Sequence, residues 1–244
     1  AENFKLLQTL YPGRIDLGIG RAPGTDPFTA AAIRYGSRVG AEHFPNMVLD
    51  LQALLNDSDP HTPGMENARA FPQVEIPPQL WMLGSSEDSA TLAALTGLPY
   101  NFAYFINPTI RPDIFDHYRE RFQPGPNYSK PHTCITLFSI TAATETEALS
   151  LSRSRDLWFI RLLRGNPGPF PSVEEAENYD YSAGELKIIA ENQDRRAVGT
   201  PAQVKEKLLS LAQQFKADEI MLVTITHDPV ARRRSYELLA SVWF

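Results

Sequence analysis

The sequence predicts an α/β fold, in which parallel β-strands alternate with helices along the chain. Two observations lead to this prediction. Short apolar segments alternate with longer segments whose apolar residues recur at helical spacing. The strand segments are also almost continuously apolar, which is typical of a parallel sheet covered on both faces.

The first predicted elements are a helix, a strand and a second helix. Residues 1–10 carry several leucines and lead into Tyr11-Pro12-Gly13, which is typical of a helix end and a turn. Residues 14–20 (RIDLGIG) predict a short strand that ends in glycines. After a long polar loop, the apolar residues of 46–55 recur at helical spacing.

Two further strand–helix units follow a proline-rich loop at 58–78. Residues 80–84 (LWMLG) predict a strand that leads directly into a helix, which closes at Gly97-Leu98-Pro99. A third strand is expected at 100–106, and a third helix at 110–122.

The second half of the chain continues the alternation with one interruption. A strand at 133–141 and a long helix at 145–163 come first. The segment 164–196 is rich in glycine, proline, asparagine and acidic residues and breaks the alternation. A helix then begins at Thr200-Pro201, and the fifth strand, 219–224 (EIMLVT), precedes the last helix.

Five strands fit either an open doubly wound sheet or an incomplete eight-stranded barrel. The chain opens within a predicted helix, which favours the incomplete barrel. A complete barrel needs three more strand–helix units of about 30 residues each, which would place roughly 90 residues ahead of Ala1.

Composition and charge argue against several classes of partner. The formal net charge is -6 and there is no run of lysines or arginines, so nucleic acid is not an expected partner. No segment approaches the roughly 20 consecutive apolar residues of a membrane span. The first ten residues resemble a helix rather than a secretory signal, so a cytoplasmic protein is expected.

The reactive side chains indicate neither a metal site nor a hydrolase. The single cysteine, Cys134, lies in an apolar run and is expected to be a buried strand residue. No two of the five histidines are three or four residues apart, so no metal ligand set is expected. A G-x-S-x-G turn is absent, which leaves a serine hydrolase unsupported.

In parallel α/β proteins the site lies at the carboxyl ends of the strands. Gly20 and Arg21 follow the first strand, where small residues let a ligand approach the backbone and a guanidinium suits an anion or a planar ring. The alternative is a surface arginine in a turn. His227 follows the fifth strand and is expected to be structural rather than a catalytic base.

Serines follow the second strand at the start of a helix. Ser85, Ser86 and Ser89 offer hydroxyls beside free backbone N–H groups, which is how helix N-termini bind phosphate. The alternative is simple N-capping, and chemistry alone favours it. Tyr104, which follows the third strand, is suited either to line a ring pocket or to pack in the core.

Residues 10–26 (LYPGRIDLGIGRAPGTD) closely resemble a signature of the bacterial luciferase-like flavin monooxygenases. The resemblance continues, in the family's order, through WMLGSS (81–86), GLP (97–99), VGTP (198–201) and ADEIM (217–221). It covers essentially the whole chain. The most similar branch is that of luciferase-type oxidoreductases with the LYPGRIDLG-GRAPG stretch.

This resemblance implies a TIM (β/α)8 barrel with about its first three βα units absent from this chain, so that residues 1–244 form a single luciferase-like barrel domain. It also implies a monooxygenase that uses reduced FMN, supplied by a flavin reductase, and O2 to oxygenate a small organic substrate. A homodimer is expected, and the segment 164–196 would be a mobile lid that shields the flavin from water.

The resemblance also assigns roles to the candidate residues. Arg21 would contact the flavin phosphate, and Ser85, Ser86 and Ser89 would complete the phosphate site. Gly20 would lie beside the reactive face of the ring, and Tyr104 would line the ring pocket. No catalytic residue is assigned.

Two alternatives to the monooxygenase stay open. One is a hydride-transfer oxidoreductase that uses the deazaflavin F420 at the same site, since relatives on this barrel use that cofactor. The other is a non-catalytic flavin-binding protein. It is favoured because the family's Glu-His-His stretch, whose histidine is functionally important, is not in this chain.

Overall fold

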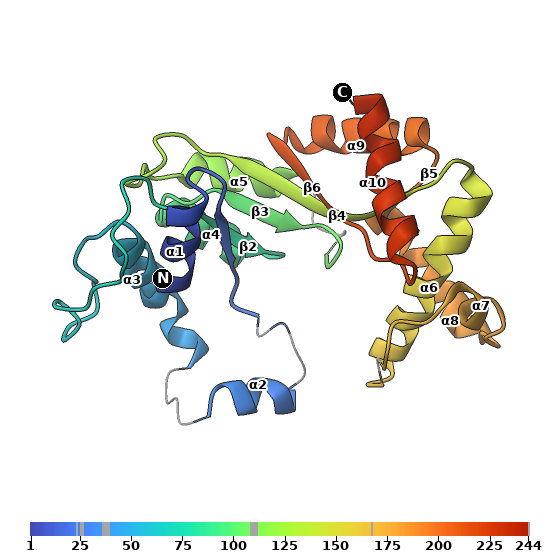
Figure 1. Ribbon diagram of the computed structural model, residues 1–244, viewed down its shortest axis with the longest axis horizontal. Coiled ribbons are helices and arrows are strands. Elements are labelled where there is room, and N and C mark those ends of the chain that lie inside the picture. Colours follow the sequence, from blue (N-terminus) through green and yellow to red (C-terminus); the bar gives the residue numbers. More distant parts are fainter. Residues whose placement is uncertain (23, 25–26, 36–39, 108–111, 167, 244) are drawn as a thin grey trace. The chain divides into compact units, whose positions relative to one another are not determined.

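The computed structural model describes residues 1–22, 24, 27–35, 40–107, 112–166 and 168–243, and it confirms the α/β class (Figure 1). The chain forms two compact units. The first unit comprises Ala1–Phe102 and Asp113–Thr133, and the second comprises Ala103–Pro112 and Cys134–Phe244. A single barrel domain over residues 1–244 stays a prediction.

The first unit is built on three parallel strands. Its elements, in chain order, are α1 (Glu2–Leu10), β1 (Asp16–Ile19), α2 (Pro27–Ile33), η1 (Ala41–His43), α3 (Phe44–Leu55), β2 (Gln79–Gly84), α4 (Glu87–Leu95), β3 (Tyr100–Ala103, the last residue falling in the second unit) and α5 (Asp113–Arg121). Strand β2 lies between β1 and β3. Strand pairing places Ile19 opposite Met82, and Met82 opposite Tyr100.

One face of this sheet forms the core of the first unit. Leu80, Met82, Tyr100 and Phe102 alternate along β2 and β3 and are almost fully buried. The ring of Phe115, on α5, contacts the rings of Tyr100 and Phe102 edge to face, at centroid distances of 6.0 and 6.3 Å. Helices α4 and α5 therefore cover this face, and Trp81 and Leu83 lie on the opposite face of β2.

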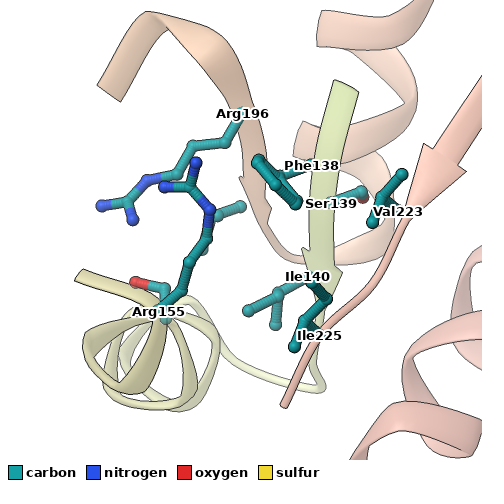
Figure 2. A pocket seen from close by; sticks show the side chains of 9 residues that line it. Phe138, Ser139, Ile140, Arg155, Arg196, Val223 and Ile225 are labelled. Carbon is teal, nitrogen blue, oxygen red and sulfur yellow. The ribbon is translucent and has the colours of Figure 1, made fainter. Parts of the chain in front are cut away.

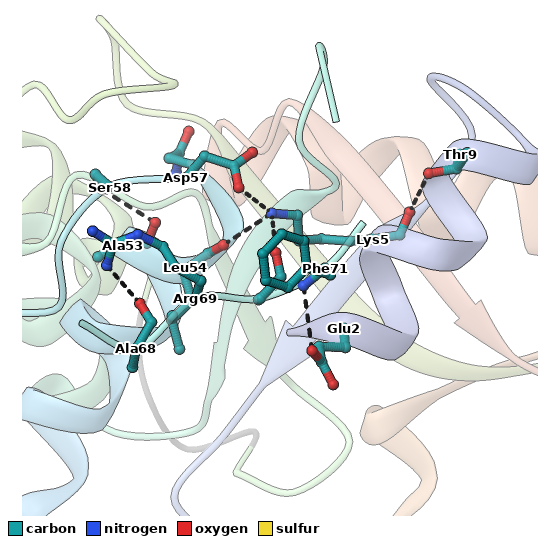
Figure 3. A network of polar contacts seen from close by, with 12 residues as sticks. Glu2, Lys5, Thr9, Ala53, Leu54, Asp57, Ser58, Ala68, Arg69 and Phe71 are labelled. Carbon is teal, nitrogen blue, oxygen red and sulfur yellow. Dashed lines mark hydrogen bonds and ion pairs between the residues drawn. The ribbon is translucent and has the colours of Figure 1, made fainter. Parts of the chain in front are cut away.

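A buried lysine ties α1 to the long loop of the first unit (Figure 3). Lys5 is fully buried, and its Nζ donates hydrogen bonds to the Asp57 carboxylate at 2.5 Å, the Ala70 carbonyl at 2.9 Å and the Leu54 carbonyl at 3.3 Å. All three N–H groups of the ammonium thus have acceptors, which is what a buried lysine requires. The loop predicted at 58–78 is confirmed as irregular, but it is anchored rather than loose.

The second unit is centred on β4. Its elements are β4 (Thr133–Thr141, beginning with the last residue of the first unit), α6 (Glu145–Leu163), α7 (Val173–Glu177), α8 (Ala183–Glu191), η2 (Gln193–Arg195), β5 (Arg196–Gly199), α9 (Pro201–Phe215), β6 (Glu219–Val223) and α10 (Pro229–Trp243). The carboxyl-terminal half of β4 pairs with β5, and its amino-terminal half pairs with β6. Both pairings are parallel.

The structure adds elements that the sequence pattern did not predict. Strand β5 is only four residues long. It begins at Arg196, which is the last residue of the segment 164–196 that was predicted to be irregular. Within the same segment, serine caps at Ser172 and Ser182 begin the short helices α7 and α8. Helix α2 lies in the predicted polar loop. The predicted helix at 110–122 begins at Asp113, and residues 110 and 111 lie outside the described residues.

Across the part of the chain that the structure describes, no helix has the combination of length and apolar character needed to cross a bilayer.

Candidate active site

The carboxyl ends of β1 and β2 meet at one edge of the first unit's sheet. A Cβ atom added to Gly20 would lie 3.2 Å from the Leu83 carbonyl oxygen, so the backbone of Gly20 runs directly beside the end of β2. Arg21 leaves β1 at this point. Because both strands run in the same direction, Arg21 and the serine turn after Gly84 lie at the same edge.

Two further glycines let the elements at this edge approach each other. A Cβ atom on Gly18 would lie 2.7 Å from Leu83 Cδ1. On Gly84 it would lie 2.1 Å from Ser89 Oγ, a distance that no real Cβ contact shows. Gly84 therefore lets the first turn of α4 sit against the end of β2.

Ser86 and Ser89 cap α4. The Ser89 N–H donates to Ser86 Oγ at 3.4 Å, and the Ser86 N–H donates to Ser89 Oγ at 3.2 Å, which is a capping box. Ser89 Oγ also donates to the Ser86 carbonyl at 2.6 Å and lies 3.1 Å from the Tyr100 hydroxyl. The capping role that the sequence left open is confirmed for both serines. Ser85 is half-buried just ahead of the cap.

Capping leaves other groups available at this edge. The backbone N–H groups of Glu87 and Asp88, in the first turn of α4, have no hydrogen-bond acceptor among the described residues. The side chains of these two acids are exposed, as is that of Arg21, which makes no polar contact with the described residues. A free helix N-terminus beside an arginine is a suitable site for an anionic group such as a phosphate.

One polar group of this site was missed by sequence reasoning. Trp81 is 8% exposed, and its Nε1 has no hydrogen-bond acceptor within the described ranges. Strand pairing places Trp81 opposite Gly18, so its ring leaves the same face of the sheet as Gly18 and Leu83. Its ring contacts that of His132 edge to face at 5.5 Å. An apolar strand pattern carries no signal for an unpaired indole N–H.

Tyr104 belongs to the second unit. It is 9% exposed, and its ring contacts that of Phe215 on α9 edge to face, at a centroid distance of 5.7 Å. Burial raises the pKa of Tyr104, and the negative charge of Asp194 raises it further. The structure thus shows its packing within the second unit, and its role in a flavin ring pocket stays a prediction.

A buried polar cluster in the second unit was also absent from the sequence-based analysis. The Arg196 guanidinium donates to both carboxylate oxygens of Asp156, at 2.6 and 3.2 Å, and to Gln193 Oε1 at 2.7 and 3.1 Å. Burial raises the pKa of Asp156, against the opposing effect of Arg196. The two partners are 40 residues apart, so no local motif reveals the pair.

The other reactive side chains discussed from the sequence, Cys134 and His227, lie in the second unit. Cys134 is a buried strand residue, as predicted, and burial raises the pKa of its thiol to about 12. Over the described ranges, no three histidine, cysteine, aspartate or glutamate side chains gather in a way that would hold a metal ion. His227, expected to be structural, lies in the loop between β6 and α10.

Residues 1–218 match the family model described as luciferase-like monooxygenase. Protein YceB of Bacillus subtilis (strain 168) is 39% identical over 243 residues, which cover 100% of this chain and 73% of YceB. A luciferase-like monooxygenase of Escherichia coli (strain K12) is 35% identical over 242 residues, which cover 99% of this chain and 71% of that protein.

Solved structures share this fold. The crystal structure of apo-MsnO8 aligns with a TM-score of 0.85 and 33% identity, covering 99% of this chain and 72% of MsnO8. Two more distant structures share the fold alone. The oxygenating constituent of a 3,6-diketocamphane monooxygenase in complex with FMN has a TM-score of 0.54 and 16% identity over 97% of this chain and 73% of its own. An F420-dependent secondary alcohol dehydrogenase aligns with a TM-score of 0.59 and 15% identity, and the alignment covers 99% of this chain and 73% of the dehydrogenase.

Proposed function

Because the chain belongs to the luciferase-like monooxygenase family, we propose that it is an FMN-dependent monooxygenase that uses reduced FMN and O2 to oxygenate a small organic substrate. The observation that carries the proposal is the edge where β1 and β2 end. There, Arg21 and the free N–H groups of α4 offer donors to one anionic group, and Gly20 carries no side chain.

The residues at this edge fit a phosphorylated flavin. Arg21 and the N–H groups of Glu87 and Asp88 would hold the phosphate through charge-assisted hydrogen bonds. Ser86 and Ser89 would act through the helix start that they fix, and Ser85 would complete the phosphate site. A Cβ at Gly20 would press on the Leu83 carbonyl, so only the bare backbone leaves a flat surface for the ring. Tyr104 would line the ring pocket.

The chemistry comes from the cofactor, since reduced FMN supplies the electrons that activate O2. The chain's own contribution is to bind the phosphate, orient the ring and keep water away from it. We assign the last role to the segment 164–196. We further propose that a separate flavin reductase supplies reduced FMN, and that the protein works as a cytoplasmic homodimer.

Cofactor preference and oxygen reactivity test this proposal. We expect the protein to retain FMN in preference to F420 when it is mixed with both and desalted, with absorption spectra identifying the bound chromophore. We also expect bound reduced FMN to be oxidised by O2 at a rate different from that of free reduced FMN. Preferential retention of F420 would support hydride transfer instead, and an unchanged oxidation rate would indicate a non-catalytic flavin-binding protein.

A further inference from the structure

Arg155 is a buried arginine that has no hydrogen-bond or ion-pair partner in the described part of the chain. It lies on α6 in the second unit and is 4% exposed. Its Nε and Nη1 are fully covered and have no acceptor. These two nitrogens carry three N–H donors, and burying them without acceptors is strongly unfavourable. An arginine in this state indicates an acceptor that comes from outside the chain.

The surroundings of Arg155 fix its position but do not neutralise it. Its guanidinium carbon lies 3.9 Å from the centre of the Phe138 ring and 5.7 Å from that of Phe159. Stacking of this kind holds the guanidinium plane and leaves its N–H groups directed sideways. Figure 2 shows the Arg155 guanidinium beside that of Arg196.

The local charge is positive. Asp156 is the carboxylate that acts on Arg155, but both of its oxygens already accept hydrogen bonds from Arg196. Two guanidinium groups therefore share one carboxylate, and Arg195 adds a further positive charge nearby. Burial and the charge of Arg196 lower the pKa of Arg155 to about 10, so it remains protonated at neutral pH.

Arg155 lines a small cavity at the carboxyl ends of β4 and β6. The cavity has a volume of about 10 Å³, which is room for one water-sized group. Most of its walls are apolar, and they include Ile140, Val223 and Ile225. Ser139 also lines it but leaves the opposite face of β4 from Phe138 (Figure 2). Two further polar residues line it, but Ser152 Oγ donates to the Leu149 carbonyl, and the Arg196 guanidinium donates to Asp156 and Gln193. Arg155 therefore supplies the donors that have no acceptor.

We propose that this cavity binds a chloride ion on the guanidinium of Arg155. The anion satisfies the buried donors and balances the excess positive charge. The small volume excludes polyatomic anions such as formate or phosphate. The residues that line the site all belong to the second unit.

Thermal unfolding at constant ionic strength tests this inference. Sodium gluconate, whose anion is too large for the cavity, is replaced stepwise by sodium chloride, formate or phosphate. We expect chloride to raise the Tm of the wild type saturably, by roughly 5 °C, and formate and phosphate to leave it unchanged.

Two variants on α6 separate binding from a general salt effect. Arg155→Met should abolish the response and should melt higher than wild type in gluconate, because it removes an unbalanced buried charge. The matched control is Arg153→Met, since Arg153 is 56% exposed on the same helix and should leave the response intact. Crystals grown in sodium bromide test the site without any variant, because bromide can replace chloride and scatters X-rays anomalously. We expect an anomalous difference peak beside Arg155.

Three results would overturn the inference. The first is an equal anion response in wild type and Arg155→Met. The second is stabilisation by formate or phosphate but not by chloride. The third is an absence of any anion response together with a bromide-free cavity, which would mean that a water molecule serves the guanidinium.

Discussion

At the scale of single residues, the most informative side chains are charged ones that the fold buries. Lys5 and Arg155 are both almost completely buried, yet they differ in their partners. Lys5 has three acceptors within the chain, so it holds structure together. Arg155 has no hydrogen-bond acceptor among the described residues, and we therefore infer that it binds a ligand. Neither state can be inferred from residue type, because both depend on residues that are distant in sequence.

The Lys5 network predicts a large stability effect from one substitution. Lys5→Met should lower the free energy of unfolding by about 2 kcal/mol or more, because it leaves the Ala70 and Leu54 carbonyls without a donor and Asp57 without its cation. Urea unfolding measures this. Lys187→Met is the control, since Lys187 is 78% exposed and should cost under about 0.5 kcal/mol. Equal losses for the two variants would contradict the network's role.

At the scale of elements, α4 is built so that two roles that the sequence presented as alternatives can coexist. Its cap uses the Ser86 and Ser89 hydroxyls, while the N–H groups of Glu87 and Asp88 remain available to a ligand. N-capping and anion binding are therefore compatible at this helix start, because they use different donors. The serine pattern correctly predicted a cap at this helix start. Phosphate binding there stays a prediction, and only the structure shows which donors the cap leaves available.

Substitutions at Ser86 separate these two roles. Ser86→Ala should lower the free energy of unfolding by about 1 kcal/mol through the lost cap. Ser86→Asp should restore the cap, since aspartate caps as well as serine, but its charge should repel the FMN phosphate. Urea unfolding and FMN titration measure the two effects. A Ser86→Asp protein that binds FMN as tightly as wild type would place the phosphate elsewhere.

At the scale of the whole molecule, the alternation of strands and helices was largely predictable from sequence. All five predicted strands are present, because each is an apolar run bounded by turn residues. Strand β5 escaped prediction because it has four residues and begins with Arg196, whose side chain is buried only through its ion pair with Asp156. A strand this short that begins with a charged residue shows no recognisable alternation of apolar residues.

For the functional residues too, features that follow a local sequence pattern could be predicted, and features that depend on distant partners could not. The common edge of Gly20, Arg21 and the serine turn could be predicted because these residues directly follow strands, and parallel strands end at a common edge. Their role in binding FMN stays a prediction. Trp81 and Arg155 could not be identified, because a tryptophan in a strand and an arginine in a helix are ordinary until their hydrogen-bond partners are known. The placement of Tyr104 in a ring pocket stays a prediction.

An FMN titration followed by flavin fluorescence shows whether the Arg21 edge binds the FMN phosphate, as we propose. Arg14 is the matched control, because it precedes β1 whereas Arg21 follows it, at the opposite end of the same strand. We predict that Arg21→Ala weakens FMN binding about 30-fold, or about 2 kcal/mol, through lost charge-assisted bonds, and that Arg14→Ala binds like wild type. Equal affinities of the wild type and Arg21→Ala for FMN would show that Arg21 does not bind the FMN phosphate.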